Sequence, residues 1–275
     1  MPSCFLEDRG LLRVTGAQAR GFLQGLFTCD VERVAPGNPA FGALLTPQGK
    51  IIVDFFLSQQ GDAFWLDAPA ALTADLLKRL RLYRLRAQIE LTDLSETMGV
   101  GAIWGGDPLP AGAEPDPRHP GLGARWIADR ATLAGLPDQR AAWAAQHIAC
   151  GVPQGGADFA YGEAFPHEAN MDLIGGVDFK KGCYVGQEVV SRVHHRGTAR
   201  RRILTAELAG QAPAPGAPVM AGEVEVGTLC SSAGNHALAS IRLDRAQDAK
   251  VAGTPLSAEG IALTLGPLPT RAAQG

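Results

Sequence analysis

The pattern of apolar residues changes near residue 197, and this change limits the possible folds more than any other feature of the chain. Before it, apolar residues at helical spacing alternate with short apolar runs that are typical of strands. After it, no helical periodicity is visible, and prolines and glycines separate short apolar runs. These strand candidates lie at residues 203–208, 219–226, 237–243 and 261–265. We therefore predict an α+β body over residues 1–197 and a small antiparallel barrel or sandwich over residues 198–275.

The body contains two clear helical stripes and one clear hairpin. Apolar side chains at positions 19, 22, 23 and 26 form one stripe, and those at 72, 76, 77 and 80 form another. Two apolar runs flank the turn sequence Thr-Pro-Gln-Gly at 46–49, which predicts a hairpin. With 275 residues the chain is long enough for two or three such units.

The charge balance and the cysteines exclude several classes of protein. The chain has 25 basic and 28 acidic residues, so it has no overall attraction to nucleic acid or a membrane surface. Glu7 and Asp8 lie where a signal peptide would be apolar, and no run is long enough to cross a membrane. Five widely spaced cysteines show no zinc-site spacing, so we expect no metal site. We expect a soluble cytoplasmic protein that binds neither membranes nor nucleic acid directly.

Residues 180–192 are the stretch that packing alone explains least. Gly182 and Gly186 enclose Cys183, with Lys181 before them and Arg192 after them. Glycines are used where the backbone needs a positive φ or a close approach. A cation beside a cysteine favours the reactive thiolate. The stretch is therefore either a tight loop with an incidental cysteine or a site with an activated thiol.

Three other features of the sequence have both a structural and a functional interpretation. Asp54 interrupts the apolar run 51–57, so it either caps a local backbone donor or points into a site. Residues 192–202 hold five arginines and two histidines, which suit a basic linker or an anion site. His147, on a helix expected to end near Cys150, is a weaker candidate for a site residue.

Common catalytic motifs are absent from the sequence. It contains no glycine-rich phosphate loop, no Gly-x-Ser-x-Gly elbow and no His-Glu-x-x-His. Cys183 with His194 or His195 could imitate a cysteine hydrolase pair, but no orienting acid is evident. Hydrolysis is therefore a weak hypothesis.

Residues 181–188, Lys-Gly-Cys-Tyr-Val-Gly-Gln-Glu, together with Arg192, resemble the signature of the YgfZ family. This family comprises folate-binding relatives of the glycine-cleavage T-protein, an aminomethyltransferase, and includes the mitochondrial factor that acts late in 4Fe–4S cluster assembly. Further segments that resemble the family are residues 16–31, 44–50, 83–86 and 166–172. The resemblance covers nearly the whole chain, with Cys29 where asparagine is usual.

The resemblance implies a three-lobed cloverleaf around a folate-sized opening, with lobes dividing near residue 98 and a C-terminal antiparallel β-barrel. It also implies tetrahydrofolate binding and a role in assembling or repairing iron–sulfur enzymes, including tRNA-modifying enzymes, with iron–sulfur clients or assembly proteins as partners. Cys183 would be the reactive thiol. The residues that it would assign to the cofactor are Asp54, Asn170, Lys181, Tyr184, Gln187 and Arg192.

Departures from the T-protein argue against aminomethyl transfer. The T-protein has paired acids after the hairpin turn, whereas this chain reads Val53-Asp54. Its folate-binding Arg and Glu are also missing from residues 147–151. The transfer needs an acid to handle protons, so we favour a non-enzymatic accessory protein. The alternatives are a folate-dependent one-carbon transferase and a pure binding module in which Cys183 is inert.

Overall fold

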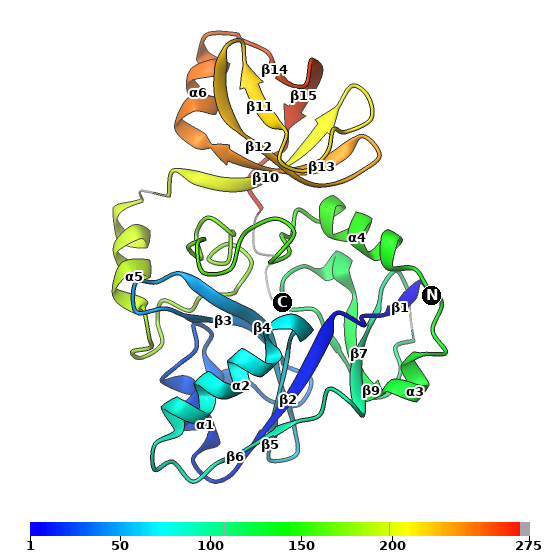
Figure 1. The fold of residues 1–275 in the computed structure, drawn as a ribbon, viewed down its shortest axis with the longest axis vertical. Helices are drawn as coiled ribbons and strands as arrows, with labels where there is room; N and C mark the ends of the chain where they lie inside the picture. Colours follow the sequence, from blue (N-terminus) through cyan, green and yellow to red (C-terminus); the bar gives the residue numbers. More distant parts are fainter. Residues whose placement is uncertain (107, 198, 270–275) are drawn as a thin grey trace.

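The structure is a computed structural model that describes residues 1–106, 108–197 and 199–269. Figure 1 shows three lobes: two α+β lobes side by side and a β-barrel stacked on them. None of the helices in these residues is long and apolar enough to cross a bilayer.

The first lobe is a five-stranded antiparallel sheet with strand order β3-β4-β5-β2-β6. Its strands are β2 (Arg9–Thr15), β3 (Ala40–Leu45), β4 (Ile51–Gln60), β5 (Ala63–Pro69) and β6 (Glu90–Asp93). Its helices are α1 (Ala19–Gln24), the short 3-10 helix η1 (Val31–Arg33) and α2 (Ala70–Arg84). The predicted hairpin and both helical stripes are confirmed.

Both faces of this sheet are buried, which explains the nearly continuous apolar run in β4. Phe55 packs with Leu12 and the helices, whereas Phe56 packs with Leu11 towards the second lobe. Alternate side chains of a strand share one face, so Asp54 lies on the same face as Phe56. The acid in the apolar run therefore faces the second lobe.

The second lobe is a four-stranded antiparallel sheet, β1-β7-β9-β8. Its strands are β1 (Ser3–Phe5), β7 (Met98–Ile103), β8 (Ala113–Pro115) and β9 (Ala124–Asp129). Its helices are the 3-10 helix η2 (Pro120–Leu122), α3 (Arg130–Leu133) and α4 (Arg140–Ala149). The N-terminal strand β1 pairs with β7, so the second lobe uses sequence from both sides of the first lobe.

The barrel is closed in the described residues, with strand order β10-β13-β12-β11-β14-β15. Its strands are β10 (Arg201–Leu208), β11 (Pro218–Ala221), β12 (Val224–Ala233), β13 (His236–Arg242), β14 (Leu256–Ala258) and β15 (Ile261–Leu265). Two sequence expectations are wrong here. Residues 219–226 are two strands because Gly222 turns the chain at φ 59°, and a helix, α6 (Leu243–Val251), lies in the tail.

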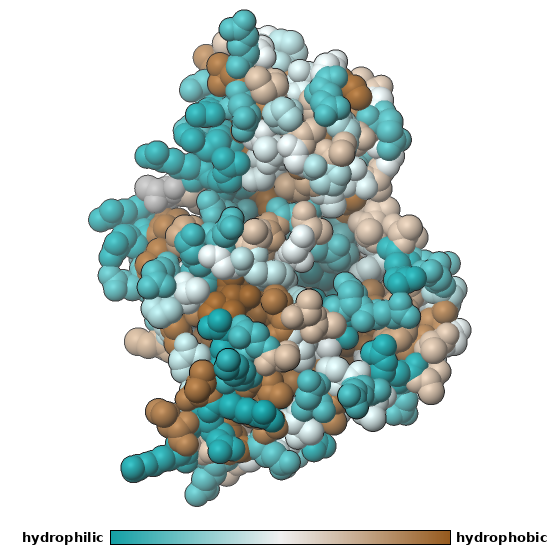
Figure 2. Space-filling view, in the orientation of Figure 1, coloured by the Kyte–Doolittle hydropathy of each residue, from teal (hydrophilic) through white to brown (hydrophobic). Residues whose placement is uncertain are grey.

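Residues 150–197 form no regular strand and lead from the body towards the barrel. Residues 165–176, named here the turn segment, form successive turns, and α5 (Gln187–Arg196) follows them. Helix α5 was not expected from the sequence. It lies at the edge of the molecule, where the surface is mostly hydrophilic (Figures 1 and 2).

Candidate functional site

The glycine-rich motif packs against the hairpin turn of the first lobe. Gly186 has φ 82° and immediately precedes α5. A Cβ atom at this position would lie 2.5 Å from the carbonyl oxygen of Thr46, which is closer than real contacts allow. Gly49 in the hairpin turn also lies close to α5, since a Cβ atom there would be 3.0 Å from Val189. The two family-like segments therefore meet, and Gly186 makes the close approach possible.

Lys181 anchors the loop from the other side. Its Nζ donates hydrogen bonds of 2.8, 2.6 and 2.8 Å to the carbonyl oxygens of Gln24, Phe27 and Cys29, at the end of α1 and just after it. These three acceptors use all three N–H donors of an ammonium group. Lys181 therefore fastens the loop to the first lobe. Its predicted role as a source of positive charge for Cys183 remains a prediction.

Cys183 is exposed, and this distinguishes it from the other four cysteines, all of which lie in described residues. Burial raises the pKa of Cys4 to about 11, and that of Cys29 and Cys230 to about 12. Cys150 is half-buried, and burial raises its pKa too. Cys183 is therefore the thiol that an external reagent or partner reaches first.

The remaining motif residues support the loop in different ways. Tyr184 is buried, and burial raises its pKa. Gln187 Oε1 accepts a 3.3 Å hydrogen bond from the backbone N–H of Tyr184. Arg192 is exposed and pairs with Glu188 at 2.5 Å. Their predicted roles in cofactor binding remain predictions.

Asn170 joins the turn segment to the barrel. It is fully buried, with φ 57°, and its Nδ2 donates a 2.6 Å hydrogen bond to the carbonyl oxygen of Ile203 in β10. Asparagine tolerates the left-handed backbone better than most residues. Its role in cofactor binding likewise remains a prediction.

Asp54 lines a cavity of about 250 Å³ between the two α+β lobes, named here the central cavity. The carboxylate Oδ1 accepts a 2.5 Å hydrogen bond from the Tyr161 hydroxyl. The other polar or aromatic residues lining the cavity are Asp8, Arg9, Phe56, Arg118, Arg125, Arg140, Trp143, His147 and Gln154. The structure thus places Asp54 at this cavity, while none of the six other predicted site residues lines it.

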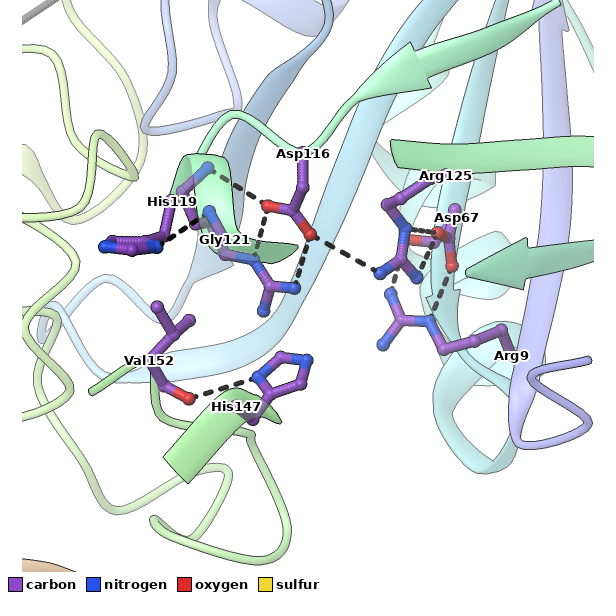
Figure 3. A network of polar contacts seen from close by, with 9 residues as sticks. Arg9, Asp67, Asp116, His119, Gly121, Arg125, His147 and Val152 are labelled. Carbon is purple, nitrogen blue, oxygen red and sulfur yellow. Dashed lines mark hydrogen bonds and ion pairs between the residues drawn. The ribbon is translucent and has the colours of Figure 1, made fainter. Parts of the chain in front are cut away.

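Three arginines that line the central cavity, Arg9, Arg118 and Arg125, belong to a network of charged residues (Figure 3). Asp67 accepts hydrogen bonds of 2.6 Å from both Arg9 Nε and Arg125 Nε. Asp116 forms a two-pronged pair with Arg118 at 3.0 and 2.8 Å. Burial opposes ionisation of Asp116, but the Arg118 guanidinium outweighs it and holds the pKa below its usual range. We name these five residues the arginine network.

The network links the two lobes. Arg9 and Asp67 belong to the first lobe, whereas Arg125 and the Asp116–Arg118 pair belong to the second. The guanidinium carbons of Arg118 and Arg125 lie 4.5 and 3.9 Å from the centre of the Phe56 ring. Asp8, Asp54 and Arg140 line the same cavity, so four arginines and four aspartates lie in or beside it, and the guanidinium groups can pair with an anionic group there. No local sequence pattern connects the residues of the arginine network, so sequence reasoning missed them.

His147 adds a neutral polar group to the same cavity. Burial lowers its pKa to about 3, so the ring is uncharged near neutral pH. Its Nδ1 donates to the Val152 carbonyl oxygen at 3.1 Å, which leaves Nε2 buried without a partner among the described residues. The sequence singled out His147 only weakly, because a lone histidine on a helix is a common structural residue.

A larger cavity of about 680 Å³ lies between α4 and the barrel. Its lining is mostly small residues, with Glu207 and His236 as its titratable groups among the described residues. No lysine or arginine of the described chain lines it, so it is less suited to an anionic ligand than the central cavity.

A second polar cluster lies beside α5, outside both cavities. The ligand-capable atoms of His167, Asp172 and His194 all lie within 4.8 Å of one another. We name them the histidine–aspartate cluster. No metal site was expected from the sequence, because the three residues do not follow a zinc motif.

Two protein families match parts of the sequence. Residues 7–108 match the family described as GCVT N-terminal domain, and residues 200–269 match that described as CAF17, C-terminal beta-barrel domain. A solved structure, the glycine cleavage system aminomethyltransferase T from Bartonella henselae, superposes with a TM-score of 0.76 at 18% identity. The superposition covers 97% of this chain and 85% of that one.

The chain has the GcvT-like α+β fold. A closed antiparallel β-barrel completes it at the C-terminus, as the resemblance implied. At 18% identity this likeness establishes the fold alone.

The names of the sequence relatives state a function other than aminomethyl transfer. Proteins of Mycosarcoma maydis, Chaetomium globosum and Phaeosphaeria nodorum are 33%, 33% and 35% identical to this chain. Each is named "Iron-sulfur cluster assembly factor IBA57 homolog, mitochondrial". The matches cover 76–80% of this chain and 58–59% of the relatives, so the chain spans less than two thirds of their length.

These names correct one expectation. A cytoplasmic location was predicted, but the relatives are named as mitochondrial proteins, so the prediction is contradicted. The expectation failed because the cellular compartment of a protein has little effect on the amino-acid composition of a folded domain.

Proposed function

We propose that this chain is a tetrahydrofolate-binding accessory protein that assembles or repairs iron–sulfur enzymes. The main support for the proposal is that Cys183 is exposed, whereas the other four cysteines are buried or half-buried. Thiolates are the usual ligands of iron–sulfur clusters, and one cysteine cannot hold a cluster alone. The chain would therefore act together with a partner protein or a small thiol that supplies the remaining ligands.

The central cavity supports the folate part of the proposal. A pterin ring presents neighbouring N–H donors on one edge, and the Asp54 carboxylate is an acceptor. The ring could stack on aromatic side chains such as Phe56 or Trp143. The glutamate carboxylates of the folate tail need cations, and Arg118 and Arg140 line the same cavity.

The resemblance to the YgfZ family also suggests which proteins would be the partners. Iron–sulfur assembly proteins or client enzymes that carry 4Fe–4S clusters would be the partners, and tRNA-modifying enzymes would be among the clients. Tyr184, Gln187 and Lys181 keep the thiol loop in place, so substituting them would impair the function indirectly.

Aminomethyl transfer is not proposed. Asp54 lacks the acidic neighbour of the T-protein, since Val53 is buried in the core of the first lobe. The Asp54 carboxylate also accepts a hydrogen bond from Tyr161. No observation favours a one-carbon transferase over a binding role.

A thermal-shift titration with tetrahydrofolate tests the folate part. A ligand that binds only the folded state raises the melting temperature as its concentration exceeds Kd. We expect such a rise for the native protein and for Asp62→Asn, an exposed turn residue, but a much smaller rise for Asp54→Asn. No shift for the native protein well above micromolar folate, or an unchanged shift in Asp54→Asn, would overturn this assignment.

A further inference from the structure

The histidine–aspartate cluster brings together three metal-binding side chains from two parts of the chain. His167 and Asp172 lie in the turn segment, and His194 lies on α5. His167 Nε2 is 4.0 Å from Asp172 Oδ2. Ligand atoms of a tetrahedral zinc site lie roughly 3.3 Å apart, given zinc–nitrogen and zinc–oxygen bonds of about 2.0–2.1 Å. A small contraction would therefore place a metal ion between these two atoms.

His167 has buried polar atoms that nothing in the described residues satisfies. The side chain is 3% exposed, and both ring nitrogens lack a hydrogen-bond partner. A buried polar atom without a partner costs about 1–3 kcal/mol, so such atoms are rare unless a ligand or water binds them. The nitrogen facing Asp172 is the one that a metal ion would satisfy.

The neighbouring residues hold the other two ligands in position. The Arg202 guanidinium donates to Asp172 Oδ1 at 2.5 Å and to Oδ2 at 2.9 Å, which fixes the carboxylate plane. The ring of His194 stacks on Phe179, with centroids 3.7 Å apart and planes 16° apart. Outer contacts of this kind orient metal ligands in known sites. Since His194 is exposed, solvent reaches the cluster from its side.

We propose that His167, Asp172 and His194 bind a divalent first-row transition-metal ion. Two imidazoles and one carboxylate form the donor set typical of non-haem iron(II), and zinc(II) accepts the same ligands. The bound ion would connect the turn segment to α5, the helix that directly follows the loop carrying Cys183. This site does not involve the central cavity and does not depend on folate binding.

Metal titration of the full-length, untagged protein after chelator treatment tests this proposal. Cobalt(II) is the spectroscopic probe, and zinc(II) and anaerobic iron(II) are measured by calorimetry. We expect one tight equivalent, with a visible cobalt absorption band. His194→Ala should weaken binding by at least about tenfold, because it removes a ligand from an exposed position that the fold does not need.

His195→Ala is the matched control, since it removes the adjacent exposed histidine on the same helix. We expect it to bind metal as the native protein does. A second variant, His167→Gln, should also lose binding, while Cys183→Ser should retain it. The proposal is overturned if the native protein binds no equivalent at micromolar metal, if His195→Ala weakens binding as much as His194→Ala, or if Cys183→Ser abolishes it.

Discussion

Gly186 lies so close to Thr46 that a methyl group would not fit between them. A Cβ atom on Gly186 would be 2.5 Å from the Thr46 carbonyl oxygen, and the φ of Gly186 is 82°. The start of α5 is thus seated on the hairpin turn of the first lobe. This contact fixes where the loop carrying Cys183 can lie.

Gly186→Ala should therefore destabilise the protein by about 2–4 kcal/mol, from the left-handed backbone and the steric clash together. Gly182→Ala is the control, because a Cβ atom on Gly182 would meet no described atom and its φ is not positive. Urea unfolding of both variants measures the difference. Equal free energies of unfolding would show that the contact is not required.

Lys181→Met should also destabilise the fold, because three backbone carbonyl oxygens lose a charged donor. Hydrogen bonds to charged groups contribute about 1.5–3 kcal/mol each and are not additive, so we expect a loss of about 2–4 kcal/mol. Lys180→Met, at an exposed neighbouring position, should change the free energy of unfolding little. If instead the two variants were equally stable, Lys181 would be free to act on the thiol.

His147 should make the protein less stable in mild acid. Its pKa is about 3 in the folded protein and 6.5 in the unfolded chain. Between these values the unfolded chain binds the additional proton, so stability falls as pH decreases below 6.5. The expected loss from pH 7 to pH 5 is about 2 kcal/mol.

Urea unfolding at several pH values measures this slope, and His147→Gln should reduce it, while the buried His167, whose pKa burial also lowers, still contributes. The Arg118 guanidinium holds the pKa of the nearby Asp116 below its usual range, so this carboxylate does not add to the slope between pH 5 and 7. His236→Gln, at an exposed position in the barrel, is the control substitution. A slope identical in native protein and His147→Gln would mean that folding does not lower the pKa of His147.

Much of the fold follows from local patterns in the sequence. The hairpin, the helices of the first lobe and most barrel strands have clear periodicity or turn residues. Helix α5 was missed because its sequence is rich in charge and has one buried apolar residue, Val190. The sequence signals of this helix are the glycines at its two ends, Gly186 and Gly197, which both adopt a left-handed backbone. The domain boundary at 197/198 remains a prediction, and limited proteolysis between α5 and β10 would test it.

The candidate sites were only partly predictable, for a physical reason. Asp54 stood out because an acid in an apolar strand needs a partner. Its neighbours in the cavity, Arg9 and Arg125, come from different lobes, and only the folded chain brings them together. The histidine–aspartate cluster depends in the same way on α5 folding back towards the turn segment.

Cys183 is the proposed thiol through which this protein supports iron–sulfur enzymes. The most direct test of this role is the activity of a 4Fe–4S enzyme in cells that lack the native protein and express a variant. We predict that the native chain and Cys150→Ala restore the activity, whereas Cys183→Ala folds with an unchanged melting temperature but does not restore it. Full restoration by Cys183→Ala would contradict the claim and leave the motif with a purely structural role.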